Sequence, residues 1–273
     1  MMTDAEKYDA CVEALREYAA GAGFSDVVIG LSGGLDSSVV AAMSVDAFGA
    51  DHVHGVLLPG PYSTDHSVDD ALDLAQRLGI EAQTVSIVEP FRAFERVLAE
   101  ACGGELAGIA AENTQARCRM VCLMAVSNAH GWMLVNTGNK SEACMGYSTL
   151  YGDTAGAFAP IGGLYKTDVY AVARARNARA EERGETAPIP DHVLTKPPSA
   201  ELSPGQEDER SLGIDYATLD AMLVAHVERG ADVDALVAAG FDPVLAENVV
   251  RRTAAYAFKR ALEPPYPTTA FYE

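Results

Sequence analysis

The sequence predicts an α/β protein with a doubly wound, mostly parallel sheet flanked by helices, and with a helical C-terminal part. Short apolar runs at 27–31, 52–58, 81–87 and 132–136 alternate with stretches of helical spacing, as βαβ units do. The first run lacks polar alternation, which is typical of a strand buried on both faces of a parallel sheet. At 273 residues the chain can bury a sizeable core, and we expect one domain over 1–273.

The helices are expected between and after these strands. Their predicted ranges are 4–20, 35–48, 65–78, 91–101, 113–129 and 166–176, and then 216–229, 233–239 and 243–262. A glycine-rich loop is expected over 147–164, and the polar, proline-rich stretch 179–211 is expected to be irregular. Within and just beyond it, 200–212 is expected to be a mobile active-site loop, and 214–262 forms the helical C-terminal part.

The composition restricts the kinds of partner. The chain carries 39 acidic against 20 basic residues, a net charge of −19 that repels nucleic acid. No apolar run approaches the roughly 18 residues of a membrane span, and the acidic start lacks a secretory apolar segment. The five cysteines contain no CxxC pair, which favours reduced thiols in a cytoplasmic protein. We therefore expect a small-molecule substrate rather than nucleic acid or a membrane.

The stretch DVVIGLSGGLDSSVV predicts a nucleotide site. A strand, a glycine turn and a helix in that order place backbone amides at a helix N-terminus, where phosphate binds. Gly33 and Gly34 let the backbone approach an anion, and Ser32 and Ser37 add hydroxyl donors. Asp36 would repel phosphate unless a divalent cation such as Mg²⁺ lies between them. The alternative is a plain glycine turn with a capping serine and a surface aspartate.

A second loop is expected at the same edge of the sheet. NTGNKSE, like SGGLDS, follows a predicted strand, and ligands of doubly wound sheets bind beyond the carboxyl ends of the strands. Thr137 and Glu142 are therefore expected to face the crevice that contains Asp36. Asp36 and Glu142 would supply carboxylates for one or two Mg²⁺ ions. For Glu142 alone, an acid favoured by the helix dipole explains the position equally well.

SGGLDS resembles the pyrophosphate-binding loop of the N-type ATP pyrophosphatases, which cleave ATP between its α and β phosphates. The runs ENTQARCRM, TGNKSE, GYSTLYGDTAGAFAPIGGLYKTDV, KPPSAEL and GQEDERSLG narrow the resemblance to the NAD synthetases. That resemblance implies an adenine nucleotide alpha hydrolase-like fold, ATP as co-substrate with Mg²⁺, and a homodimer. It implies amidation of deamido-NAD with ammonia to give NAD, AMP and pyrophosphate. A GMP synthetase-like ligase and a non-catalytic nucleotide-binding protein remain alternatives.

The same resemblance assigns roles to individual residues. ATP would be bound by Gly30, Leu31, Ser32, Gly33, Gly34, Leu35, Asp36, Ser37, Thr137, Lys166 and Ser199. Deamido-NAD would be bound by Arg117, Phe258 and Lys259. Magnesium would be bound by Asp36 and Glu142, with Ser199 supporting a second ion. The residues expected to act in catalysis are Asp36, Lys166 and Asp153.

Four basic residues can be judged from their positions alone. Arg117 and Arg119 are two apart on one helix and point to different faces, so one can grip phosphate while the other pairs with an acid. For Arg119 a surface ion pair is an equally good explanation. Lys166 begins a helix, where the dipole disfavours a cation, so we expect an anionic partner, with a solvated side chain as the alternative. Lys196 precedes two prolines, which suits either a fixed contact or an ordinary loop lysine.

Two departures from the family pattern concern the nitrogen source. NAD synthetases that use ammonia often have an acidic residue at the position of Ala157, close to where ammonia is thought to bind. In this chain the role of that acid is unfilled or is taken by Asp153. GDTAGAFAP and KPPSAEL resemble glutamine-dependent members, which carry an N-terminal glutaminase, whereas about 25 residues precede the first strand here. We therefore expect free ammonia or a separate glutaminase partner. Cys102, Cys118 and Cys122 are expected to be buried small hydrophobes.

Overall fold

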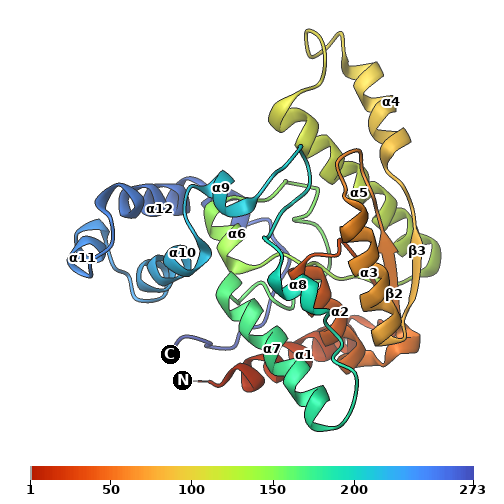
Figure 1. The fold of residues 1–273 in the computed structure, drawn as a ribbon. Helices are drawn as coiled ribbons and strands as arrows, with labels where there is room; N and C mark the ends of the chain where they lie inside the picture. Colours follow the sequence, from red (N-terminus) through yellow and green to blue (C-terminus); the bar gives the residue numbers. More distant parts are fainter. Residues whose placement is uncertain (1) are drawn as a thin grey trace.

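A four-stranded parallel sheet forms the centre of the molecule (Figure 1). The computed structural model describes residues 2–273. The strands are β1 (Val27–Gly30), β2 (Val53–Leu57), β3 (Glu81–Thr84) and β4 (Met133–Leu134), in the order β3-β2-β1-β4. Because the chain moves outward from β1 through β2 to β3 and then returns to the other side of β1, the strand order reverses between β1 and β4. Such a reversal leaves a crevice at the carboxyl ends of the strands, and it confirms the predicted α/β fold class.

Helices cover both faces of the sheet. On one face lie α1 (Asp4–Ala22), α2 (Leu35–Phe48), α3 (Asp65–Leu78) and α7 (Lys166–Glu182). On the other face lie α4 (Val88–Leu98) and α5 (Gly108–His130). Val27 and Ile29 of β1 belong to the first core and Val28 to the second, and all three are fully buried. Burial on both faces explains why this strand shows no polar alternation.

The C-terminal helices form a lobe beside the sheet (Figure 1). Its elements are α9 (Asp208–Leu212), α10 (Tyr216–Leu223), a π-helical turn (Val224–Glu228), α11 (Val233–Ala238), α12 (Pro243–Ala255) and α13 (Ala257–Arg260). They enclose their own core, to which α6 (Lys140–Met145) contributes Cys144 and Met145. Because α6 follows β4 directly, the lobe is tied to the edge of the sheet where the crevice lies. The final residues return to the main core, where Phe271 is buried.

Several boundaries differ from the sequence expectations. Helix α5 begins five residues early at Gly108, and α7 continues to Glu182 rather than to 176. Both extra segments consist mostly of Ala, Arg and Glu, which form helix well but give no apolar periodicity to detect. The stretch 179–211 is not wholly irregular, because α8 (Asp191–Thr195) and the start of α9 lie in it. In the described part of the chain, no helix has both the length and the apolar character needed to cross a membrane.

Candidate active site

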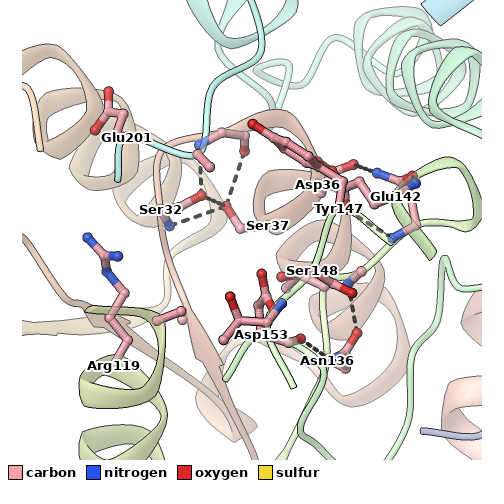
Figure 2. Close-up of a pocket in the computed structure, with 18 of the residues that line it drawn as sticks. Ser32, Asp36, Ser37, Arg119, Asn136, Glu142, Tyr147, Ser148, Asp153 and Glu201 are labelled. Atoms are coloured by element: carbon pink, nitrogen blue, oxygen red, sulfur yellow. Dashed lines mark hydrogen bonds between the residues drawn. The ribbon is translucent and has the colours of Figure 1, made fainter. Parts of the chain in front are cut away.

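A cavity of about 470 Å³ lies at the carboxyl ends of the strands. Its wall includes the loop after β1, the loop after β4 and the segment 196–202. Figure 2 shows Asp36 and Glu142 on one side of this cavity, and Arg119 and Glu201 on the other. The two motif loops therefore meet in one cavity, as the strand pattern predicted.

The glycine turn forms an anion cradle at the start of α2. Gly33 has φ +76°, and a Cβ added there would lie 2.0 Å from the carbonyl oxygen of Ser67, so only glycine fits. The Ser32 hydroxyl accepts a hydrogen bond from the Gly34 amide at 3.1 Å and lies 3.0 Å from the Ser37 hydroxyl. No side chain caps α2, so the amides of its first turn remain available to an anion.

Lys166 lies between two carboxylates opposite this cradle. Its Nζ pairs with Oδ2 of Asp36 and lies 3.5 Å from Oε1 of Glu142. Asn139, the N-cap of α6, donates from Nδ2 to Oδ1 of Asp36 at 3.2 Å. Lys166 is only 2% exposed, so the alternative of a solvated side chain is wrong and the expected anionic partners are present.

The two carboxylates are crowded in a place that disfavours negative charge. Burial, with the charge of Asp36 added, raises the pKa of Glu142 to about 8. Burial by itself would lower the pKa of Lys166, but Asp36 and then Glu142 outweigh it and raise that pKa well above its ordinary value. Glu142 keeps some accessible surface and is one of the residues that line the cavity.

This donor set fits a magnesium ion that phosphate oxygens help to hold. Mg²⁺ is commonly bound by one or two carboxylates together with substrate phosphates. Asp36 and Glu142 supply those carboxylates, and the adjacent cradle would receive the phosphates. Among residues 2–273, no group of three or more His, Cys, Asp and Glu side chains is arranged to hold a metal ion by itself. Mg²⁺ held by these two carboxylates would therefore require further ligands, such as the phosphate oxygens of a nucleotide.

Asp208 is a third acid at this end that the sequence reading missed. It lies at the start of α9, lines the cavity and is 4% exposed, and its Oδ1 has no hydrogen-bond partner within the described residues. Burial raises the pKa of Asp208. It belongs to the run GQEDERS, which reads as a charged surface loop, and nothing in that run distinguishes the buried acid from its exposed neighbours.

Asp153 and Asn136 lie on the cavity floor (Figure 2). The Asn136 side chain donates to the carbonyl oxygens of Asp153 at 2.7 Å and Ala155 at 2.8 Å, which fixes the loop that carries Asp153. Burial raises the pKa of Asp153 to about 6, although its carboxylate is open to the cavity. Asn136 was not predicted as a functional residue; a polar residue at the end of a predicted buried strand was the available signal.

The segment 196–207 contributes to the cavity wall and is tied to the N-terminal part of α3. Lys196 Nζ donates to Oδ2 of Asp70 at 2.7 Å, so its contact is fixed and it is not an ordinary loop lysine. Glu201 accepts from the Thr64 amide at 3.1 Å and from the Ser67 hydroxyl at 2.7 Å. Its φ of +48° is uncommon for a non-glycine residue and costs about 1 kcal/mol or more. The bonds to α3 offset that strain.

The predicted ATP residues come together, with one exception. Those lining the cavity are Gly30, Leu31, Ser32, Gly34, Leu35, Asp36, Ser37, Thr137, Lys166 and Ser199. Gly33 packs against α3 instead of lining the cavity. The Ser199 hydroxyl donates to the carbonyl oxygen of Gln206 at 2.6 Å, within the segment 196–207.

The predicted deamido-NAD residues do not all reach the cavity. Lys259 lines it and donates to the carbonyl oxygens of Gly146 and Ser148 at 2.8 and 2.6 Å. Arg117 and Phe258 lie outside; Arg117 is exposed and donates to the carbonyl oxygen of Leu150 at 3.1 Å, and Phe258 is 56% exposed. Arg119 points to the opposite face of α5, as predicted.

The structure also tests the expectations for Arg119 and for three of the cysteines. Arg119 lines the cavity and donates to the carbonyl oxygen of Leu58 at 3.0 Å, so the surface ion pair proposed as an alternative is wrong. Cys118 is buried and Cys122 is half-buried. The expectation for Cys102 is wrong, because the turn that follows α4 leaves it exposed.

A glycine turn at the reversal point of a parallel sheet, facing a buried lysine and two carboxylates, defines an α/β fold of the adenine nucleotide alpha hydrolase-like type. The NAD synthase family model matches residues 7–263, and the chain belongs to that family. It is 44% identical over 275 residues to the glutamine-dependent NAD(+) synthetase of Rhodobacter capsulatus, with 98% of this chain and 49% of that protein covered. The chain thus spans about half the length of the curated relatives it matches.

Two solved structures match nearly end to end. The NH3-dependent NAD synthetase of Campylobacter jejuni, in complex with the nitrate ion, has a TM-score of 0.75 and 28% identity, with 95% of this chain and 96% of that chain covered. The NMN synthetase of Francisella tularensis has a TM-score of 0.77 and 28% identity, with 95% and 97% covered. Both are similar to this chain in fold, and their names differ in the product.

Proposed function

We propose that this chain amidates deamido-NAD with ammonia, converting ATP to AMP and pyrophosphate and giving NAD. One observation carries the proposal: in a member of the NAD synthase family, the β1–α2 cradle shares a cavity with Asp36, Glu142 and Lys166. A carboxylate does not react with ammonia directly, because the leaving group would be oxide. ATP is required to convert the carboxylate oxygen into a better leaving group.

The reaction divides into two balanced steps. The nicotinate carboxylate attacks the α-phosphorus of ATP, the bond to the β-phosphate breaks, and pyrophosphate leaves with that electron pair. Ammonia then attacks the acyl carbon of the adenylated intermediate, AMP leaves, and the nitrogen gives up one proton. Asp153 faces the cavity and, with a pKa raised by burial to about 6, is a better proton acceptor than an ordinary aspartate.

Negative charge gathers on pyrophosphate in the first step, and donors of this chain would stabilise it. The first-turn amides of α2 and the Lys166 ammonium would bind the outer phosphoryl groups. Asp36 and Glu142 would hold Mg²⁺, which when bound neutralises phosphate charge. Removing one such donor typically costs about 3 kcal/mol at the transition state.

We propose that deamido-NAD is held by Lys259, Arg117 and Phe258, with a second copy of the chain completing the site. Arg117 and Phe258 lie outside the cavity of their own chain, and exposed apolar residues accompany them. Among these, Val121 on α5 is 66% exposed. A homodimer that covers this face would place Arg117 and Phe258 against a substrate bound between the two subunits. Sedimentation or gel filtration at micromolar concentration tests it, and a monomer that turns over normally would contradict it.

The nitrogen source is proposed to be free ammonia or ammonia from a separate glutaminase partner. The relative from R. capsulatus is named glutamine-dependent, and the one from C. jejuni is named NH3-dependent. Assays of this chain alone, with ammonium and with glutamine, distinguish the use of ammonia from hydrolysis of glutamine by the chain itself. Amide transfer from glutamine by the chain alone would contradict the proposal. A pull-down with candidate amidotransferases tests the partner.

One assay separates the proposed function from its rivals. AMP formation is measured with ATP, Mg²⁺ and ammonium, and with deamido-NAD, nicotinic acid mononucleotide or xanthosine monophosphate as acceptor. We expect deamido-NAD to give the highest kcat/KM. Preference for the mononucleotide would favour NMN synthesis, which the likeness to the F. tularensis protein makes a second candidate. Turnover of xanthosine monophosphate would indicate a GMP synthetase-like ligase, and ATP binding without AMP would indicate a sensor.

A further inference from the structure

A buried carboxylate in the C-terminal lobe contacts the start of two helices that carry site residues. Asp220 lies on α10 and is 3% exposed. Its Oδ1 accepts a hydrogen bond from the Ser141 hydroxyl at 2.5 Å, and its Oδ2 accepts one from the Thr167 amide at 2.8 Å. Ser141 belongs to the first turn of α6 and Thr167 to the first turn of α7. Asp220 therefore bridges two helix N-termini.

Ser141 extends this bridge to Lys166. The Lys166 amide donates to the Ser141 hydroxyl oxygen at 2.9 Å, so the hydroxyl proton of Ser141 is free to point at Asp220. Tyr165, the N-cap of α7, offers no side-chain cap. The first two amides of α7 are thus satisfied from α6 and α10 rather than from the helix itself.

The bridge also answers why a lysine can begin α7. A cation at a helix N-terminus is disfavoured by the helix dipole. The buried carboxylate of Asp220 lies against that end and offsets its positive potential. On the α6 side, Ser141 is followed directly by Glu142, whose Oε1 lies 3.5 Å from Lys166 Nζ. The Asp220 carboxylate thus accepts from the side chain next to Glu142 and from the main-chain amide next to Lys166.

We propose that Asp220 is a positioning residue for the proposed reaction, fixing Lys166 and Glu142 relative to each other through Ser141 and the first turn of α7. The inference rests on the proposed function only for its kinetic consequence. It gives the C-terminal lobe a part in the reaction, because that lobe supplies the residue that sets the geometry of the pair.

Asp220→Asn tests the proposal because it preserves shape and removes one acceptor. An asparagine can accept from only one of the two donors and presents an N–H to the other. The matched control is Asp215→Ala: Asp215 is the N-cap of the same helix, and within the described residues its carboxylate is bonded to the Thr218 amide at 2.8 Å and to the Thr218 hydroxyl, with no hydrogen bond to α6 or α7. We expect Asp220→Asn to lower kcat at least about tenfold while the KM for ATP changes by less than about twofold.

The control and a double variant separate positioning from general stability. Asp215→Ala should keep kcat within about twofold of wild type even where its Tm falls as far as that of Asp220→Asn. Ser141→Ala should lower kcat, and the Ser141→Ala/Asp220→Asn pair should be no slower than Asp220→Asn alone. Equal kcat losses in Asp215→Ala and Asp220→Asn, or losses that multiply in the pair, would overturn the proposal.

A crystal structure of Asp220→Asn gives a readout that does not depend on turnover. We expect the Lys166 Nζ–Glu142 Oε1 separation to depart from 3.5 Å while the β1–α2 cradle keeps its conformation. An unchanged separation would overturn the positioning role. If wild type shows no turnover of deamido-NAD, the proposed function fails, and this crystallographic comparison still decides whether Asp220 positions the pair.

Discussion

The end of the cavity around Lys166 and the surface around Arg117 and Phe258, called here the phosphate end and the outer end, differ in how far their residues are buried. At the phosphate end, Lys166 is 2% exposed, and its partners Asp36 and Glu142 come from the N-termini of two other helices of the same chain. At the outer end, Phe258 is 56% exposed and Arg117 lies on the surface. The difference teaches that burial marks the half of a site that folding alone creates. The exposed half is the part for which a second copy of the chain is proposed to complete the site.

The largest expected effect comes from the phosphate end. Asp36→Ala should reduce turnover on the order of 10²–10³-fold, because it removes a proposed magnesium ligand and the partner of Lys166. AMP release measures the loss, and Tm checks that the fold survives. Asp73→Ala on α3, which breaks a solvent-exposed pair with Arg77 at 2.9 Å, is the control and should be near wild type. Near-normal rates in Asp36→Ala would break the comparison at its stronger end.

A glycine variant tests how rigid that end is. Gly33→Ala should lose about 1–3 kcal/mol of stability from its positive φ and more from the clash with the Ser67 carbonyl. Gly184→Ala isolates the first contribution, since Gly184 has a similar φ of +71° and nothing within 4 Å of an added Cβ. Urea unfolding measures both. Equal losses in the two variants would mean that the approach to α3 is looser than described.

The outer end is expected to act on one substrate only. Arg117→Ala should raise the KM for deamido-NAD about tenfold and leave the KM for ATP unchanged, because Arg117 lies outside the nucleotide cavity. Arg251→Ala, which removes an exposed arginine bonded to Asn248, serves as the control. A matching rise in the KM for ATP would contradict this expectation and would show that the two ends are coupled.

The segment 196–207 should have a smaller effect. Glu201→Ala removes its hydrogen bonds to Thr64 and Ser67 and lowers the fraction of molecules in which the segment is docked. We expect the apparent affinity for ATP to fall on the order of fivefold. Calorimetric titration with an unreactive ATP analogue measures it, with Glu185→Ala as an exposed control. An unchanged affinity would mean that docking of the segment does not contribute to binding.

The smallest expected effect is the pH dependence of stability at Asp153. Burial raises its pKa from 3.8 to about 6 in the folded state, so the folded protein binds a proton more tightly than the unfolded chain. Stability from this group is present below about pH 4 and is lost as the pH rises through about 6. Relative to wild type, Asp153→Asn should therefore gain Tm between pH 4 and pH 7. A constant difference in Tm would show that the carboxylate is well solvated.

The sequence predicts those features whose residues are close together in the chain. The strand, glycine turn and helix of 27–48 are one continuous unit, and all four strands were predicted because each apolar run is local. Helix starts without apolar periodicity, such as that of α5, were placed late. Asp220 gave no signal, because its partner Ser141 is 79 residues away and nothing local distinguishes it from a surface acid. Asp208 was also not predicted, because nothing in its local sequence distinguishes it from a surface acid.

Ser67 links two regions that were described separately. Its carbonyl oxygen faces Gly33, and its hydroxyl donates to Glu201 and lies 3.3 Å from Lys196 Nζ. Substitutions that shift the first turn of α3 would consequently disturb both the glycine turn after β1 and the segment 196–207. A variant that is meant to change only one of these two regions should therefore keep Ser67 and alter residues on the other side of the cavity.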